Sequence, residues 1–235
     1  MVKFIVGSVA ACALASAVSV LLVAPVRAEG KRAVRAACFG DSITEGYKIT
    51  DAFTTPYPDM LQKLLDEKKG KGAYEVINAG ISGQDTRQGL ARLDDVLKKK
   101  PDWMLLLYGT NDLWTSRKMA LSDTDKNLRA IVAKIKAAGV KCMIGTIVPT
   151  WDFDAKVSAI NDVIKKIAKD ESITAVDMNE SFEKALGEAG DRAKSATWER
   201  YYQVEDGGFV HPNDKGNKII ADNWYGALDR EERRK

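Results

Sequence analysis

Apolar runs of strand length alternate along this chain with longer stretches in which apolar residues recur every three or four positions. The short runs occupy residues 33–39, 74–78, 103–108, 140–147 and 173–177. The helical stretches occupy residues 57–69, 86–99, 123–138 and 155–169, and a last helix is expected from the N-cap Asn213 to about residue 228. Strands that alternate with helices form a parallel sheet with helices on both faces. The sequence therefore predicts an α/β fold.

The first 28 residues have the features of an export signal. Lys3 precedes a largely apolar run, and Val26-Arg27-Ala28 ends it with the small-residue pattern of a cleavage site. The run has about the ~20 residues that span a bilayer, so an uncleaved anchor is the alternative. Lipidation at Cys12 is a weaker alternative, because the apolar residues 13–26 would then follow the lipidated cysteine. We expect cleavage after Ala28, no stable membrane anchor, and one domain over residues 29–235, periplasmic or secreted.

Four polar motifs follow the predicted strands or precede the last helix. They are Gly-Asp-Ser-Ile-Thr-Glu-Gly at residues 40–46, Asn-Ala-Gly-Ile-Ser-Gly at 78–83, Gly-Thr-Asn-Asp at 109–112 and His-Pro-Asn at 211–213. Each alone is explained by a turn or a helix cap. Together they fall on the carboxyl edge of a parallel sheet, where open α/β sheets bind ligands. This order indicates a functional site.

The residue types in these motifs suit nucleophilic catalysis. A serine hydroxyl such as that of Ser42 is a poor nucleophile until a base within ~3 Å removes its proton. His211 is the only histidine of the chain, so no other imidazole competes for this role. Fixed hydrogen-bond donors at ~2.7–3.1 Å would stabilise the oxyanion that forms. We expect Ser42 to be the nucleophile and His211 the general base.

The motifs resemble those of the SGNH, or GDSL-type, hydrolase family, over essentially the whole chain after the signal. The segment from Asn78 to Asp112 looks most like the bacterial periplasmic thioesterase and lysophospholipase (arylesterase) branch, although Thr110 replaces the second glycine of that branch. The resemblance implies a three-layer α/β/α flavodoxin-like fold with strand order 2-1-3-4-5. It also implies an oxyanion hole formed by the amides of Ser42 and Gly83 and by the side chain of Asn111.

The acid of the triad departs from the family pattern. The family places an aspartate three residues before the histidine, and here that residue is Gly208. The nearest upstream acids are Asp206 and Glu205. We expect the chain to bulge at its glycines and bring Asp206 to the far nitrogen of His211. The alternatives are a serine–histidine dyad oriented by a backbone carbonyl, or an acid elsewhere in the chain.

No metal or cofactor is expected, because one histidine and scattered carboxylates such as Asp152 and Asp154 form no recognisable ligand set. A net charge of +3 gives no reason to expect a nucleic-acid partner. In the implied strand order, Cys38 and Cys142 lie on strands that are second neighbours, roughly 9–10 Å apart, which exceeds the ~7 Å limit for a disulfide. We expect both to be buried free thiols.

The leading hypothesis is hydrolysis of carboxylic esters or thioesters through an acyl-Ser42 intermediate. The substrate is then a small acyl ester, a lipid ester or an acetylated sugar. Carbohydrate acetylesterase or O-acetyltransferase activity is the second hypothesis, and a catalytically weak binding protein is the third. Aromatic residues at 151–153 and 198–202 either flank the pocket or pack laterally over the sheet. The sequence does not choose among these substrates and sets no oligomeric state.

Overall fold

The computed structural model describes residues 32–47, 55–151, 153–205 and 208–234, so the expected signal segment lies outside the described residues. Five parallel strands form one sheet in the order β2-β1-β3-β4-β5. They are β1 Val34–Gly40, β2 Tyr74–Gly80, β3 Trp103–Leu107, β4 Lys141–Gly145 and β5 Thr174–Val176. The parallel sheet and its implied strand order are confirmed, and each strand lies within about two residues of the range expected from the sequence.

The helices are α1 Ser42–Glu45, α2 Tyr57–Lys69, α3 Thr86–Leu97, α4 Leu121–Ala137, α5 Asp154–Asp170, α6 Met178–Ala189, α7 Ser195–Trp198 and α8 Asp214–Arg233, with 3₁₀ turns η1 Thr110–Leu113 and η2 Thr115–Arg117. The side chain of Asn213 caps α8 as expected, by accepting the amides of Lys215 and Gly216. Helix α6 was not expected from the sequence. Asp177 is its N-cap, and the side chain of this residue accepts the Glu180 amide.

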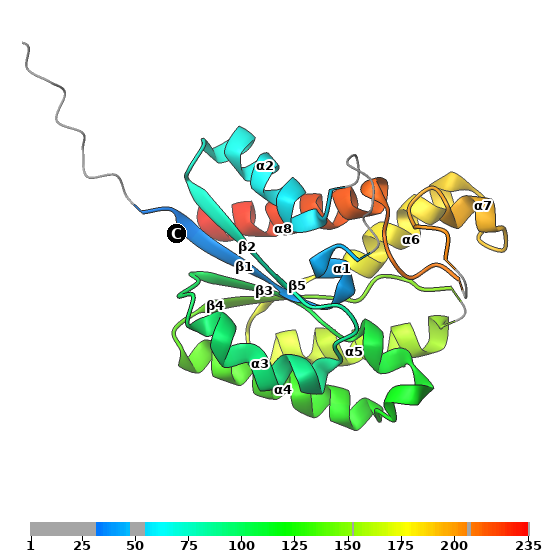
Figure 1. Ribbon diagram of the computed structural model, residues 1–235, viewed down its shortest axis with the longest axis horizontal. Coiled ribbons are helices and arrows are strands. Elements are labelled where there is room, and N and C mark those ends of the chain that lie inside the picture. Colours follow the sequence, from blue (N-terminus) through cyan, green and yellow to red (C-terminus); the bar gives the residue numbers. More distant parts are fainter. Residues whose placement is uncertain (1–31, 48–54, 152, 206–207, 235) are drawn as a thin grey trace, which may run out of the picture. The chain divides into compact units, whose positions relative to one another are not determined.

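Each face of the sheet has its own hydrophobic core, because successive strand residues point to opposite faces. Ala36 and Cys38 of β1 pack in one core with residues of α2, α6 and α8. Ala37 and Phe39 pack in the other core with residues of α3, α4 and α5. Figure 1 shows these two groups of helices on opposite sides of the sheet. The arrangement confirms the expected three-layer α/β/α fold.

Cys38 and Cys142 are free and buried, as the strand order implied. Burial raises the pKa of the Cys38 thiol and raises that of Cys142 to about 12, so both are protonated at neutral pH. In the part of the chain that the structure describes, no helix is long and apolar enough to cross a bilayer.

The carboxyl ends of three neighbouring strands lie at one level. Gly40 at the end of β1 pairs with Gly80 of β2 on one side and with Leu107 of β3 on the other. Arg92 of α3 fastens this edge, since its guanidinium donates to the carbonyls of Gly40 at 2.9 Å and Ala79 at 2.7 Å. The motifs that follow these strands therefore start side by side.

Candidate active site

Ser42 is the first residue of α1 and follows β1 after a single intervening residue. The side chain of Asp41 caps the helix by accepting the Ile43 amide at 3.0 Å. Gly80 allows the end of β2 to lie against α1, because a Cβ there would stand 2.1 Å from the Glu45 nitrogen. These contacts fix Ser42 at the carboxyl edge of the sheet.

His211 joins Ser42 to a carboxylate. Its Nε2 lies 2.8 Å from Ser42 Oγ, and its Nδ1 lies 2.6 Å from Glu205 Oε1. The histidine and glutamate side chains are only 13% and 10% exposed, so water competes little for either hydrogen bond. The geometry is that of a nucleophile, a base and an orienting acid in line.

A backbone hairpin brings Glu205 to His211. Tyr202 pairs antiparallel with Pro212 and Glu205 with Gly208, while the Gln203 amide donates to the His211 carbonyl at 2.8 Å. The chain therefore reverses direction, and Glu205 lies beside His211, six positions later in the sequence. The expected acid, Asp206, lies outside the described residues. The carboxylate that the structure places at Nδ1 is its neighbour Glu205.

Two of the three expected oxyanion donors, Gly83 and Asn111, lie on adjoining loops, and the third, the Ser42 amide, lies at the start of α1. Asn111 Nδ2 donates to the Gln84 carbonyl at 3.1 Å, which ties η1 to the loop containing Gly83. Gly83 has a φ of +75°, a backbone conformation that residues other than glycine rarely adopt. Its carbonyl accepts a 2.6 Å hydrogen bond from Arg117. Sequence reasoning did not anticipate a role for Arg117, which belongs to no recognised motif.

A cavity of about 180 Å³ opens at Ser42. Its lining also includes His211, Glu205 and Asn111, together with Thr110, Trp114, Gly208 and Val210. The structure thus brings Ser42, Asn111 and His211 to one small space. Gly83 does not line this cavity and is connected to it through the bond between Asn111 and Gln84.

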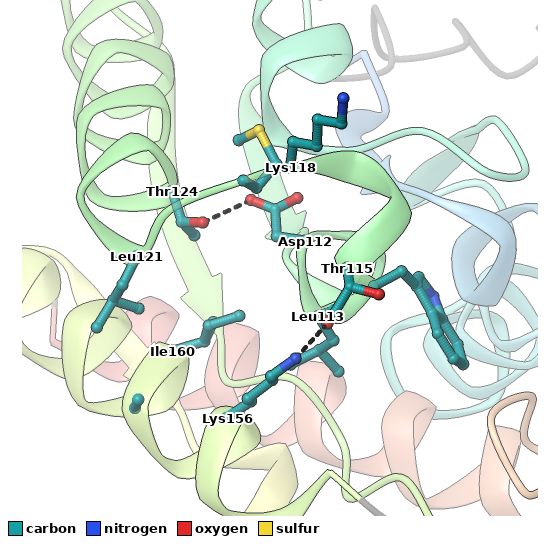
Figure 2. Close-up of a pocket in the computed structure, with 11 residues that line it drawn as sticks. Asp112, Leu113, Thr115, Lys118, Leu121, Thr124, Lys156 and Ile160 are labelled. Atoms are coloured by element: carbon teal, nitrogen blue, oxygen red, sulfur yellow. Dashed lines mark hydrogen bonds between the residues drawn. The ribbon is translucent and has the colours of Figure 1, made fainter.

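A second cavity of about 380 Å³ lies between η1, η2, α4 and α5, and Figure 2 shows its lining. Trp114 lines both cavities, so the larger space adjoins the one at Ser42 at this residue. Leu113, Leu121 and Ile160 contribute apolar surface. Asp112, buried at its edge, accepts from the hydroxyls of Thr86 at 2.6 Å and Thr124 at 2.8 Å. Those bonds hold η1 against α3 and α4.

Most of the aromatic residues between 151 and 202 serve packing. Trp198 and Tyr202 are 3% and 1% exposed and belong to the core under α8. The Trp151 ring packs edge-on against Trp198 at 5.4 Å and Phe209 at 5.5 Å. Of the two alternatives for these segments, the structure favours lateral packing for Trp198 and Tyr202.

The pKa of Asp41, next to the nucleophile, is raised to about 7 by burial. Its Oδ2 atom is buried and has no hydrogen-bond partner among the described residues. Among the described residues, no group of three or more histidine, cysteine, aspartate or glutamate side chains is placed to hold a metal ion.

Residues 38–219 match the GDSL-like Lipase/Acylhydrolase family, and the chain belongs to that family. It is a hydrolase that acts on ester bonds. The family assignment confirms the resemblance seen in the motifs around Ser42, Asn111 and His211.

Two curated relatives illustrate the range of the family. The chain is 29% identical to thioesterase 1/protease 1/lysophospholipase L1 of Escherichia coli K12, covering 78% of this chain and 77% of that protein. It is 28% identical to an acetylxylan esterase of Geobacillus stearothermophilus, covering 77% of this chain and 88% of that protein. Among solved structures, the acetyl xylan esterase AlAXEase is similar, with a TM-score of 0.71 and 25% identity over 83% of this chain and 100% of that one.

Proposed function

We propose that the protein hydrolyses carboxylic esters or thioesters through an acyl-Ser42 intermediate, with His211 as general base and Glu205 as the acid that orients it. The observation that carries this proposal is the continuous pair of hydrogen bonds from Ser42 Oγ through the imidazole to Glu205, at 2.8 and 2.6 Å. The hypothesis of a catalytically weak binding protein rested on the missing acid at position 208, and a carboxylate at Nδ1 argues against it.

In the first half-reaction, His211 Nε2 takes the proton of Ser42 while Oγ attacks the carbonyl carbon. The tetrahedral intermediate collapses, and His211 returns the proton to the departing alcohol or thiol. A water molecule then attacks the acyl-Ser42 ester with His211 again as base, releasing the carboxylic acid and free Ser42. The Glu205 carboxylate fixes the tautomer with hydrogen on Nδ1 and stabilises the imidazolium formed in each step.

The negative charge that develops on the substrate oxygen needs fixed donors. We assign these to the amides of Ser42 and Gly83 and to Asn111 Nδ2, which has a hydrogen left after its bond to the Gln84 carbonyl. Preorganised donors stabilise the intermediate more than the neutral ground-state carbonyl.

The test measures nitrophenyl ester hydrolysis and fluorophosphonate labelling in Ser42→Ala, His211→Ala and the double variant. Each single variant should lose nearly all turnover, and the double variant should be little worse, because the two residues act as one unit. Labelling should disappear in Ser42→Ala. Wild-type turnover in Ser42→Ala would exclude the acyl-enzyme mechanism.

Hydrolysis of short acyl esters on carbohydrates is the second candidate. The cavity at Ser42, of about 180 Å³, suits an acetyl group, and acetylxylan esterases are among the relatives. A series of nitrophenyl esters from acetate to decanoate separates this candidate from one acting on lipid esters. Product analysis with an added sugar acceptor separates hydrolysis from acetyl transfer.

A further inference from the structure

The loop that carries the Gly83 amide, residues 81–84, is held by side chains from three different elements. Glu45 of α1 accepts the Ser82 amide at 2.8 Å. Arg117 of η2 donates to the Gly83 carbonyl at 2.6 Å, and Asn111 of η1 donates to the Gln84 carbonyl at 3.1 Å. We refer to residues 81–84 as the oxyanion loop.

The peptide that bears the Gly83 N–H lies between two peptides that are fixed from outside the loop. Glu45 holds the peptide before it through the Ser82 amide, and Arg117 holds the peptide after it through the Gly83 carbonyl. Gly83 itself has a φ of +75°, a region that glycine enters without steric cost, so its own backbone does little to restrict the peptide. The orientation of one N–H thus depends on both outer contacts.

Arg117 contributes its charge as well as its hydrogen bond. Among the described residues, no carboxylate oxygen lies within 4.0 Å of its guanidinium nitrogens. The positive charge therefore acts on the Gly83–Gln84 peptide, next to the amide that would face the developing oxyanion. A charged donor makes a shorter and stronger hydrogen bond to a carbonyl than a neutral one does.

We propose that Arg117 is a positioning residue for ester hydrolysis, which holds the Gly83 amide in its donor orientation through the Gly83 carbonyl. The role rests on the proposed function of Ser42 and its oxyanion hole. It also gives η2 a part in catalysis, because Arg117 of this turn is hydrogen-bonded to the oxyanion loop.

The experiment compares Arg117→Met with Arg117→Lys. Loss of a whole oxyanion donor costs roughly a hundred- to a thousandfold in turnover, so misorienting one donor should cost about ten- to a hundredfold. Arg117→Met should lower kcat by that factor and change KM by less than about threefold, because the contact acts on the transition state. Arg117→Lys keeps a charged donor and should recover most of the loss. Fluorophosphonate labelling of Ser42 should slow in parallel with kcat/KM.

Lys118→Met provides the matched control, since it removes a positive charge from the next residue. Among the described residues, the Lys118 side chain makes no hydrogen bond to the oxyanion loop, and its variant should stay within about twofold of wild type. The pH midpoint of kcat/KM should not move in Arg117→Met. A shifted midpoint would mean that Arg117 acts on His211 by charge alone, and would overturn the positioning role.

Unchanged kcat in Arg117→Met, a loss confined to KM, or an equal loss in Lys118→Met would also overturn it. Where Arg117→Met fails to fold, Arg117→Gln replaces it in the same comparison. Ser42→Ala is assayed in parallel. Activity retained in Ser42→Ala would remove the proposed function itself, whereas an inactive Ser42→Ala beside a fully active Arg117→Met would remove only the role of Arg117.

Discussion

The carboxylate of Glu205 accepts a hydrogen bond at the imidazole nitrogen that faces away from Ser42. In other serine triads, replacing this acid by its amide lowers turnover by about ten thousandfold, because the imidazole takes the wrong tautomer. We expect Glu205→Gln to lower kcat by up to about this factor, with little effect on KM. Steady-state hydrolysis of a nitrophenyl ester measures it.

The Asp206→Asn variant is the matched control, because it removes the same charge from the next residue in the sequence. It should cost less than about tenfold if Glu205 orients His211. A damaging Asp206→Asn beside a harmless Glu205→Gln would assign the acid to Asp206. Small losses in both variants would favour a dyad in which the backbone orients the ring.

The buried carboxyl of Asp41 should make the free energy of unfolding depend on pH. Burial raises the pKa of its carboxyl to about 7, whereas an aspartate in the unfolded chain titrates near ~4. Between these values the folded protein holds a proton that the unfolded chain has released, so stability falls as pH rises towards 7 and levels off above it. Over this pH range the free energy of unfolding should fall by roughly a few kcal/mol, and Asp41→Asn should remove most of that fall. Urea unfolding from pH 4.5 to 8 measures the difference, and an unaltered slope would show that Asp41 is ionised throughout.

At the scale of the elements, Trp114 lines both the cavity at Ser42 and the larger one beside α4 and α5. Trp114→Ala should join the two and admit longer acyl chains. Burial of two of the additional methylenes of octanoate, at ~0.8 kcal/mol each, predicts that kcat/KM for octanoate relative to acetate rises about tenfold in this variant. Phe153→Ala is the control, because Phe153 packs edge-on against Trp114 at 4.8 Å but lines neither cavity. An unchanged ratio in Trp114→Ala would show that the acyl group takes another path.

The elements differ in how far the sequence predicts them. Strands such as Trp103–Leu107 are buried on both faces and read as continuous apolar runs, so they are visible without knowledge of their neighbours. Helix α6 was missed although Met178, Phe182 and Leu186 recur every fourth residue, because it follows β5 directly after its cap Asp177. Glu205 and Arg117 were not assigned roles, because a hairpin and a 3₁₀ turn place them through pairing between loops. Local periodicity does not record such pairing.

At the scale of the whole molecule, we propose that the chain is exported and cleaved after Ala28. The signal features precede Arg32, where the described structure begins, so cleavage there would leave the sheet complete. Mass spectrometry of the secreted or periplasmic protein should give a mature N-terminus at Glu29. A product that retains residues 1–28 in the membrane fraction would indicate an uncleaved anchor instead.

Ser42 and His211 lie 169 residues apart in the chain, and α8 begins three residues after the histidine. The base therefore reaches the nucleophile only after the segment that carries His211, and that leads into α8 beside α2, has been synthesised and has packed. A partly synthesised chain, or one still crossing a membrane, contains the nucleophile without its base and cannot form the triad. Esterase activity consequently reports that this long-range contact has formed, and in a refolding experiment it should return no earlier than the packing of the His211 segment against Ser42.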